Sequence, residues 1–244
     1  MCFFYSPFQE SLKEFKRKQA NGELLINVAD AILSAAVSSH SISKSEDGFV
    51  HFGDSVVLLN PETSRSLAYA VNSFTKPSEA LSATASSETH ALQRNVFTIA
   101  SSGSSLEPGA ILCYGSHFSL VAKDPFGKER CLRSERMSLH SGASLLSGKQ
   151  SVSLVDSGDK KSHNDMWQVV CYDPQQRLET DGQPVPANTP LILRHVASNI
   201  NLALLSDVVV RSQLGLEPEI VCHNFLNIHK AELPPNVWVL ALEQ

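Results

Sequence analysis

The adjacent residues Cys222 and His223 come closest, in this sequence, to pairing a nucleophile with a base. A nucleophilic hydrolase needs an activated Ser or Cys held by a base, and no Ser-rich stretch contains the Gly-x-Ser-x-Gly turn that presents such a serine. Because neighbouring side chains on a strand point to opposite faces, a strand here would hold the thiol and the imidazole apart. We therefore interpret Cys222 as a core residue and His223 as a surface or backbone-bonded residue, and we expect no catalytic residues and no enzyme.

The histidines and carboxylates do not form a metal-ligand pattern. None of the 9 histidines has the His-x-x-x-His spacing that places two ligands on one helix face, and His223 and His229 are too loosely spaced. The acidic stretch from Asp156 to Asp165 lacks the pattern of a calcium loop and is predicted to be a solvated turn. A Gly-rich phosphate cradle is also missing from the sequence, so we expect no metal and no other cofactor.

A cluster of cations lies near the N-terminus: Lys13, Lys16, Arg17 and Lys18. With Glu10 and Glu14 they give residues 1–22 a net charge of +2, and since the whole chain carries -5, the remaining residues carry -7. Two interpretations stay open: a solvated helix face with basic residues near its C-terminus, or a contact with an acidic partner. The same two interpretations apply to the loops that bear Arg130, Arg133 and Arg136.

The clustered cations fall in a segment with helical periodicity. A first helix is predicted over residues 10–19, with Leu12 and Phe15 at i and i+3 and a stop signal at Asn21-Gly22. A second helix is predicted from residue 23 to about 39, with an apolar stripe: Leu25, Val28, Ile32, Leu33 and Ala36. A Ser-rich linker follows, so we predict a helical N-terminal extension over residues 1–45, in which Leu12 and Phe15 join the four cations in a partner-binding surface.

Charge and cysteine content limit the environment of the chain. Its net charge of -5 gives no reason to expect nucleic acid or an anionic membrane as partner. The 5 cysteines are odd in number and contain no Cys-x-x-Cys pair, so we expect reduced thiols rather than a disulfide framework. The sequence has neither a secretory signal nor a run of about 18 apolar residues, and we expect a cytoplasmic protein.

From residue 46 onward a pattern of short strands repeats three times. A turn residue that tolerates positive φ opens each repeat: Gly53, Gly115 and Asn188. The third and fifth positions after it are apolar: Val56 and Leu58, Phe118 and Leu120, Leu191 and Leu193. The two-residue period of a strand points both positions to one side.

Two later features recur in the same order within each repeat. A second strand offers a leucine: Leu67, Leu132 and Leu202. The closing strands start at residues 95, 165 and 236, which are 70 and 71 residues apart, and each carries one aromatic core residue: Phe97, Trp167 and Trp238. Any one pair of short apolar strands can look alike by chance, but three concordant features favour a mainly β, closed, pseudo-threefold architecture.

These repeats resemble the MIR domain, a β-trefoil module, and particular segments are similar to the family of cilia- and flagella-associated protein 161. The segments that carry the resemblance are 46–54, 94–97, 113–115, 167, 173–179, 184–188 and 235–238. The resemblance implies a β-trefoil (MIR-like) domain over residues 46–244. Two parts depart from the family pattern: residues 1–8 lack its N-terminal stretch, and residues 68–92 are Ser/Ala-rich and match poorly.

The resemblance also implies a function. Members of this family are microtubule inner proteins, on the lumenal wall of the A-tubule in the axonemal doublet microtubules of motile cilia and sperm flagella. The expected partners are tubulin and neighbouring inner proteins, with no nucleic acid and no membrane, and the expected location is the cytoskeleton of the cilium or flagellum axoneme. The alternative is an MIR-type ligand-binding or protein-interaction module outside the axoneme, for which a secretory signal or attached membrane segments would be expected.

Overall fold

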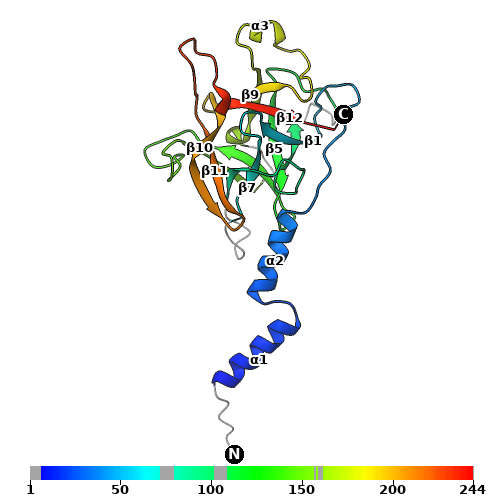
Figure 1. The fold of residues 1–244 in the computed structure, drawn as a ribbon, viewed down its shortest axis with the longest axis vertical. Coiled ribbons are helices and arrows are strands. Elements are labelled where there is room, and N and C mark those ends of the chain that lie inside the picture. The colour runs from blue at the N-terminus through cyan, green and yellow to red at the C-terminus, as the bar shows by residue number, and fades with distance from the viewer. Residues whose placement is uncertain (1–6, 72–79, 102–108, 157, 159–161, 244) are drawn as a thin grey trace, which may run out of the picture.

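The structure is a computed structural model that describes residues 7–71, 80–101, 109–156, 158 and 162–243. Figure 1 shows a β-rich body from which two consecutive helices extend, with the N-terminus at the far end of the first helix. The chain enters the body after the second helix and remains there to its C-terminus. The predicted helical extension is thus present, and it projects from the body as an arm.

The two helices are α1 (Pro7–Ala20) and α2 (Leu25–Ala36). Gly22, at φ +70°, lies in the short turn between them, where the sequence predicted a stop. Most of the predicted apolar stripe on α2 reaches the body: Ile32 and Ala36 are buried and Val28 and Leu33 pack against the core, whereas Leu25 is 63% exposed. Leu25, in the first turn of α2, is thus the member of the stripe that lies outside the contact with the β domain.

The body contains strands joined by turns and longer loops, two 3-10 helices and the short helix α3. Their bounds are β1 (Ser55–Asn60), β2 (Arg65–Tyr69), β3 (Leu81–Ser86), β4 (Val96–Ser101), β5 (His117–Lys123), β6 (Glu129–Ser134), β7 (Gln150–Asp156), η1 (His163–Asp165), β8 (Trp167–Cys171), α3 (Arg177–Thr180), β9 (Pro190–His195), β10 (Ile200–Ser212), β11 (Gly215–Cys222), η2 (Pro234–Asn236) and β12 (Val237–Ala241). Three successive groups of four strands correspond to the three sequence repeats.

The strand pairing is that of a β-trefoil. The first and last strands of each group close a barrel: β1 pairs with β4 and β12, β5 with β4 and β8, and β9 with β8 and β12. The second and third strands form hairpins, and their inner strands β3, β7 and β11 pair with one another around the axis. This confirms the predicted fold class, a mainly β, pseudo-threefold trefoil with an N-terminal helical segment.

The three turn residues have the same backbone conformation and make the same hydrogen bond in each repeat. Gly53, Gly115 and Asn188 have φ values of 99°, 84° and 59°, a region that glycine and asparagine tolerate best. Their N–H groups donate to equivalent carbonyls on the closing strands: Gly53 to Ile99, Gly115 to Val169 and Asn188 to Leu240. In each of the three repeats the chain therefore bends into the barrel wall at the equivalent position.

The segments just before these turns close one end of the barrel. The N–H of Val50 donates to the carbonyl of Val185 at 3.0 Å, Val185 donates to Leu112 at 2.9 Å, and Leu112 donates back to Val50 at 2.8 Å. All three residues are buried, and each lies three positions before its turn residue. We call this cycle the Val50–Leu112–Val185 ring.

The core is built from equivalent side chains of the repeats. The six strand residues predicted to face one side are fully buried: Val56, Leu58, Phe118, Leu120, Leu191 and Leu193. Phe97, Trp167 and Trp238 are fully buried as well. Both indole N–H groups donate to equivalent carbonyls, Trp167 to Leu132 at 2.9 Å and Trp238 to Leu202 at 3.1 Å. Phe97 fills the corresponding place without an N–H group.

A buried polar side chain anchors the start of each closing strand. Asn95 and Asn236 each accept an N–H from a nearby loop through Oδ1, at 2.7 Å from Leu92 and 2.7 Å from Phe225. Asp165 accepts the N–H of Ser162 and binds Arg133 through both carboxylate oxygens, at 2.6 and 2.9 Å. The expectation that the stretch ending at Asp165 is a solvated turn is therefore wrong for its last residue, which is a buried anchor.

Replacing Trp238 tests the core packing. Trp238→Ala leaves a cavity and is expected to lower the free energy of unfolding by about 3 to 5 kcal/mol, measured by urea denaturation. Trp238→Phe is the matched control, because Phe97 shows that a phenyl ring fits the equivalent place, and its loss should be clearly smaller. A loss for Trp238→Ala below about 1 kcal/mol would contradict a core role.

Candidate partner-binding surface

Helix α1 presents two large apolar side chains that nothing in the described chain covers. Leu12 is 43% exposed and Phe15 is 50% exposed, although both have the helical spacing that normally buries an apolar stripe. Figure 1 shows why: α1 lies beyond α2, away from the β body. An amphipathic helix whose apolar stripe stays open is a typical element for docking on a partner.

The predicted cations flank this stripe. With 3.6 residues per turn, Lys16, Lys13 and Arg17 follow one another on the side next to Leu12, whereas Lys18 lies on the other side, next to Phe15. Lys18 forms an ion pair with Glu14 at 2.9 Å. The hydrogen bond from Lys18, and then its charge, hold the pKa of Glu14 below its usual value. The structure therefore groups Lys13, Lys16 and Arg17 on one side and separates Lys18 from them.

The exposed apolar surface continues into α2. Leu25 and Ile26 in its first turn are 63% and 67% exposed, and they follow the turn at Gly22. Ile26 was not among the predicted contact residues, although two consecutive apolar residues at a helix start are an unusual pattern for a helix with a single buried stripe. The candidate surface is thus longer than predicted and spans both helices.

Of the second group of cations, Arg130 fits neither of the two interpretations, a solvated face or a partner contact, because it is buried. Arg130 is 1% exposed, and its guanidinium binds the carboxylates of Asp124 and Asp156, both at 2.9 Å. Arg133 binds Asp165. Both arginines lie on β6, where Arg130 pairs with buried Asp124 and exposed Asp156, and the partly exposed Arg133 pairs with buried Asp165. Arg136, in the following loop, is exposed.

Cys222 and His223 have the separate environments expected for neighbours at the end of a strand. Cys222 is buried, and burial raises the pKa of its thiol to about 12, so the nucleophilic thiolate is absent at neutral pH. The His223 ring lies edge-on to Phe225, with ring centroids 4.7 Å apart. Within the described ranges, three or more His, Cys, Asp or Glu side chains do not gather anywhere as metal ligands.

A serine and a histidine that sequence analysis did not single out lie in contact. His195 is fully buried, with Nε2 3.0 Å from the carbonyl oxygen of Asn164, so Nε2 carries the proton and Nδ1 accepts from the Ser198 hydroxyl at 2.8 Å. Gln150 Nε2 donates to the same hydroxyl at 2.9 Å, and the His195 ring packs on Trp167. The pair closes the turn after β9, and its buried base cannot reach a substrate, so its role is structural.

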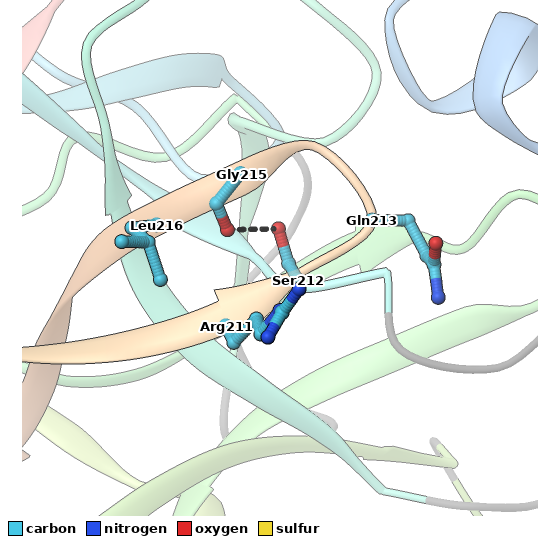
Figure 2. Close-up of a pocket in the computed structure, with 5 residues that line it drawn as sticks. All are labelled: Arg211, Ser212, Gln213, Gly215 and Leu216. Atoms are coloured by element: carbon cyan, nitrogen blue, oxygen red, sulfur yellow. Dashed lines mark hydrogen bonds between the residues drawn. The ribbon is translucent and has the colours of Figure 1, made fainter.

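A hollow of about 780 Å³ lies at the turn of the β10–β11 hairpin. Figure 2 shows its lining residues: Arg211, Ser212, Gln213, Gly215 and Leu216. The Ser212 hydroxyl donates to the carbonyl of Gly215 at 3.2 Å and thereby closes the turn. Arg211 is the one charged residue of this lining, so the hollow has no convergent groups for catalysis.

Comparison with known proteins finds relatives over most of the chain. The Cilia- and flagella-associated protein 161-like domain matches residues 31–243. The chain is 34% identical over 251 residues to Cilia- and flagella-associated protein 161 of Mus musculus, covering 95% of this chain and 82% of that protein. It is 32% identical over 251 residues to the protein of the same name from Danio rerio, covering 96% and 82%. These matches confirm the resemblance expected from the sequence, and α1 precedes the matched domain.

Solved structures share the fold of the body. The SDF2-like protein from Arabidopsis thaliana superposes with a TM-score of 0.59 at 16% identity, over 80% of this chain and 99% of that one. A chain of the S. cerevisiae protein O-mannosyltransferase Pmt1-Pmt2 complex bound to the sugar donor gives 0.57 at 17% identity, over 84% of this chain and 26% of that one. At these identities the likeness concerns the fold alone. Of the helices in the described ranges, none has the length and apolar character to cross a membrane.

Buried His195 is expected to make stability depend on pH. Burial lowers its pKa, so between this value and the ordinary value of about 6.5 the unfolded chain binds more protons than the folded one. The stabilisation is present above about pH 6.5 and is lost as the pH falls through the lowered pKa. Urea denaturation between pH 5 and 7 should show a flatter pH profile for His195→Gln than for the wild type. Equal slopes would contradict the assignment.

Proposed function

We propose a structural role in cilia and flagella for this chain, which belongs to the cilia- and flagella-associated protein 161-like family. The single observation that carries this proposal is the match of the family domain to residues 31–243. More specifically, we propose a microtubule inner protein that binds the lumenal wall of the doublet A-tubule and stabilises it for motility of the cilium or sperm flagellum. Tubulin and neighbouring inner proteins are the proposed partners.

The use of the polar groups in the body supports a structural role rather than an enzymatic one. The side chains that could be reactive already have structural roles: the Cys222 thiol is buried, His195 closes a turn, and Arg130 neutralises carboxylates. Such a protein functions through its shape and its surface contacts. A stabilising interface of this kind needs on the order of 1,000 Å² in total, and repetition along a lattice adds avidity.

Helix α1 is the proposed contact with tubulin. The body is negatively charged and tubulin is acidic, so bringing them together costs electrostatic work unless a local positive surface meets the lattice. Residues 1–22 carry a net charge of +2, and Leu12 and Phe15 offer apolar anchors beside the cations. We infer that the cations face acidic groups while the stripe formed by Leu12 and Phe15 packs on apolar surface.

Charge reversal on α1 tests the electrostatic part of this contact. Each exposed ion pair contributes only about 0.2 to 1 kcal/mol, so single substitutions can be silent. Reversing all four predicted cations to Glu should lower retention on salt-washed axonemes by about tenfold or more, measured by fractionation and quantitative blotting, with unchanged thermal unfolding. The variant combines these changes: Lys13→Glu, Lys16→Glu, Arg17→Glu and Lys18→Glu.

A control variant with the same net charge reverses four exposed cations of the body: Lys44→Glu, Lys123→Glu, Lys128→Glu and Arg136→Glu. It should stay on the axoneme. If the α1 variant is retained and the body variant is released, the body loops bind the lattice and α1 does not. If the wild type itself appears in the soluble extract, the structural axonemal role is wrong and the module outside the axoneme is favoured.

Removal of the apolar anchors tests the other part of the contact. The double variant Leu12→Ser and Phe15→Ser should release the protein from axonemes even at high salt, because apolar contacts are not screened. Since both side chains are about half exposed, the free energy of unfolding should stay within about 0.5 kcal/mol of the wild type. Retention equal to the wild type at every salt concentration would show that this stripe makes no contact.

A further inference from the structure

Two carboxylates on β11 lie in similar positions but have different partners. Glu217 and Glu219 are two residues apart, so their side chains leave the same face of the strand, and each is 7% exposed. Glu217 binds Arg94 with both oxygens at 2.6 Å and accepts the Thr84 hydroxyl at 2.8 Å. Glu217 is thus neutralised and hydrogen-bonded inside the protein.

Glu219 has no such neutralising partner among the residues that the structure describes. Its Oε1 accepts a hydrogen bond from the Ser144 hydroxyl, whereas Oε2 is buried and has no hydrogen-bond partner in the described chain. Among the described cations, Arg94 binds Glu217, and Lys149 lies over the Phe225 ring, 5.7 Å from its centroid. A buried carboxylate without a cation or a full set of donors is costly for the folded state.

The unpaired carboxylate lines a hollow at the hairpin end of the trefoil. This hollow has a volume of about 380 Å³ and lies where β3, β7 and β11 meet. Ser82 and Ser153 contribute to its wall, and Leu145 and Leu146, from the loop between β6 and β7, form an apolar rim. Leu146 is 58% exposed and Leu145 is completely exposed, so the rim has no cover in the described chain. We call this hollow the Glu219 pocket.

We propose that the Glu219 pocket binds a lysine or arginine side chain from an apolar-flanked segment of a partner protein. A carboxylate only accepts hydrogen bonds, so its natural complement is a donor that also carries positive charge. The serine hydroxyls can accept the remaining hydrogens of an ammonium or guanidinium group, and the leucine rim covers the methylene stem and apolar neighbours. Arg94 on Glu217 shows the same pairing in the same protein.

This inference does not depend on the proposed contact between α1 and tubulin. The two surfaces have opposite charge and use different residues, so variants of α1 leave the Glu219 pocket intact. Failure of the axoneme experiment would therefore leave the pocket open to test, and failure of the pocket experiment would leave the α1 contact untouched.

The test uses the full chain and short peptides as probes. Acetyl-Leu-Lys-Leu-amide and acetyl-Leu-Arg-Leu-amide are titrated while the methyl NMR signals of pocket residues are followed: Leu145, Leu146, Val152, Val210 and Ile220. Both peptides should shift these signals. The peptide with an ε-acetylated lysine should bind at least about tenfold more weakly, because acetylation removes the charge.

Glu219→Gln is the matching protein variant, because it removes the charge and keeps the size of the side chain. It should weaken binding of both basic peptides at least about tenfold and raise the melting temperature of the free protein, since an uncompensated buried charge disappears. Glu179→Gln, on exposed α3, changes the net charge equally and should bind like the wild type.

Several results would overturn the proposal. These are equal binding of the acetylated and unmodified lysine peptides, undiminished binding to Glu219→Gln, or no shift of the wild-type signals by either basic peptide. Shifts caused by mannose alone would identify a polyol site instead. Concentration-dependent self-association that is lost in Glu219→Gln would make α1 of a second copy the occupant, in place of another protein.

Discussion

The closed end of the barrel depends on backbone hydrogen bonds that run in a cycle. In the Val50–Leu112–Val185 ring each segment donates to one neighbour and accepts from the other, so all three repeats must be present for every one of these groups to be satisfied. The ring places three segments side by side, and the positive-φ residues that follow turn each of them into the barrel wall. This closure then fixes the relative positions of the paired strands, the buried aromatic residues and the hairpins around the axis.

Most polar groups inside the body stabilise the framework of three β repeats, which we call the frame. Asn95, Asp165 and Asn236 hold the starts of the closing strands, and the ion pairs of Arg130 and Arg133 neutralise carboxylates that the frame buries. Because a buried charge is tolerable only with its partner, these residues are not free to bind a substrate. Surface chemistry therefore concentrates at two places that the frame leaves open, the arm formed by α1 and α2 and the Glu219 pocket.

Local patterns predicted the frame well. The two-residue period placed Val56 and Leu58 inside, and the tolerance of Gly53 for positive φ located the bend. What sequence alone could not provide was the choice of partner between distant residues. Local periodicity did not show that the Arg130 guanidinium is buried between Asp124 and Asp156, and it does not say which end of α2 the β domain covers. The unpaired oxygen of Glu219 becomes visible only when the donors of the described residues have positions.

The pairing of β1 with β12 has a consequence for biosynthesis. Val57 lies opposite Ala241, so although β1 can pair with β2 and β4 soon after they are synthesised, its pairing with β12 must wait until β12 has been translated. Such long-range closure raises the contact order and slows folding, and it leaves the edge of β1 open during translation. A nascent or C-terminally truncated chain therefore exposes an unpaired, aggregation-prone strand edge. We expect such a chain to need chaperones until β12 has paired.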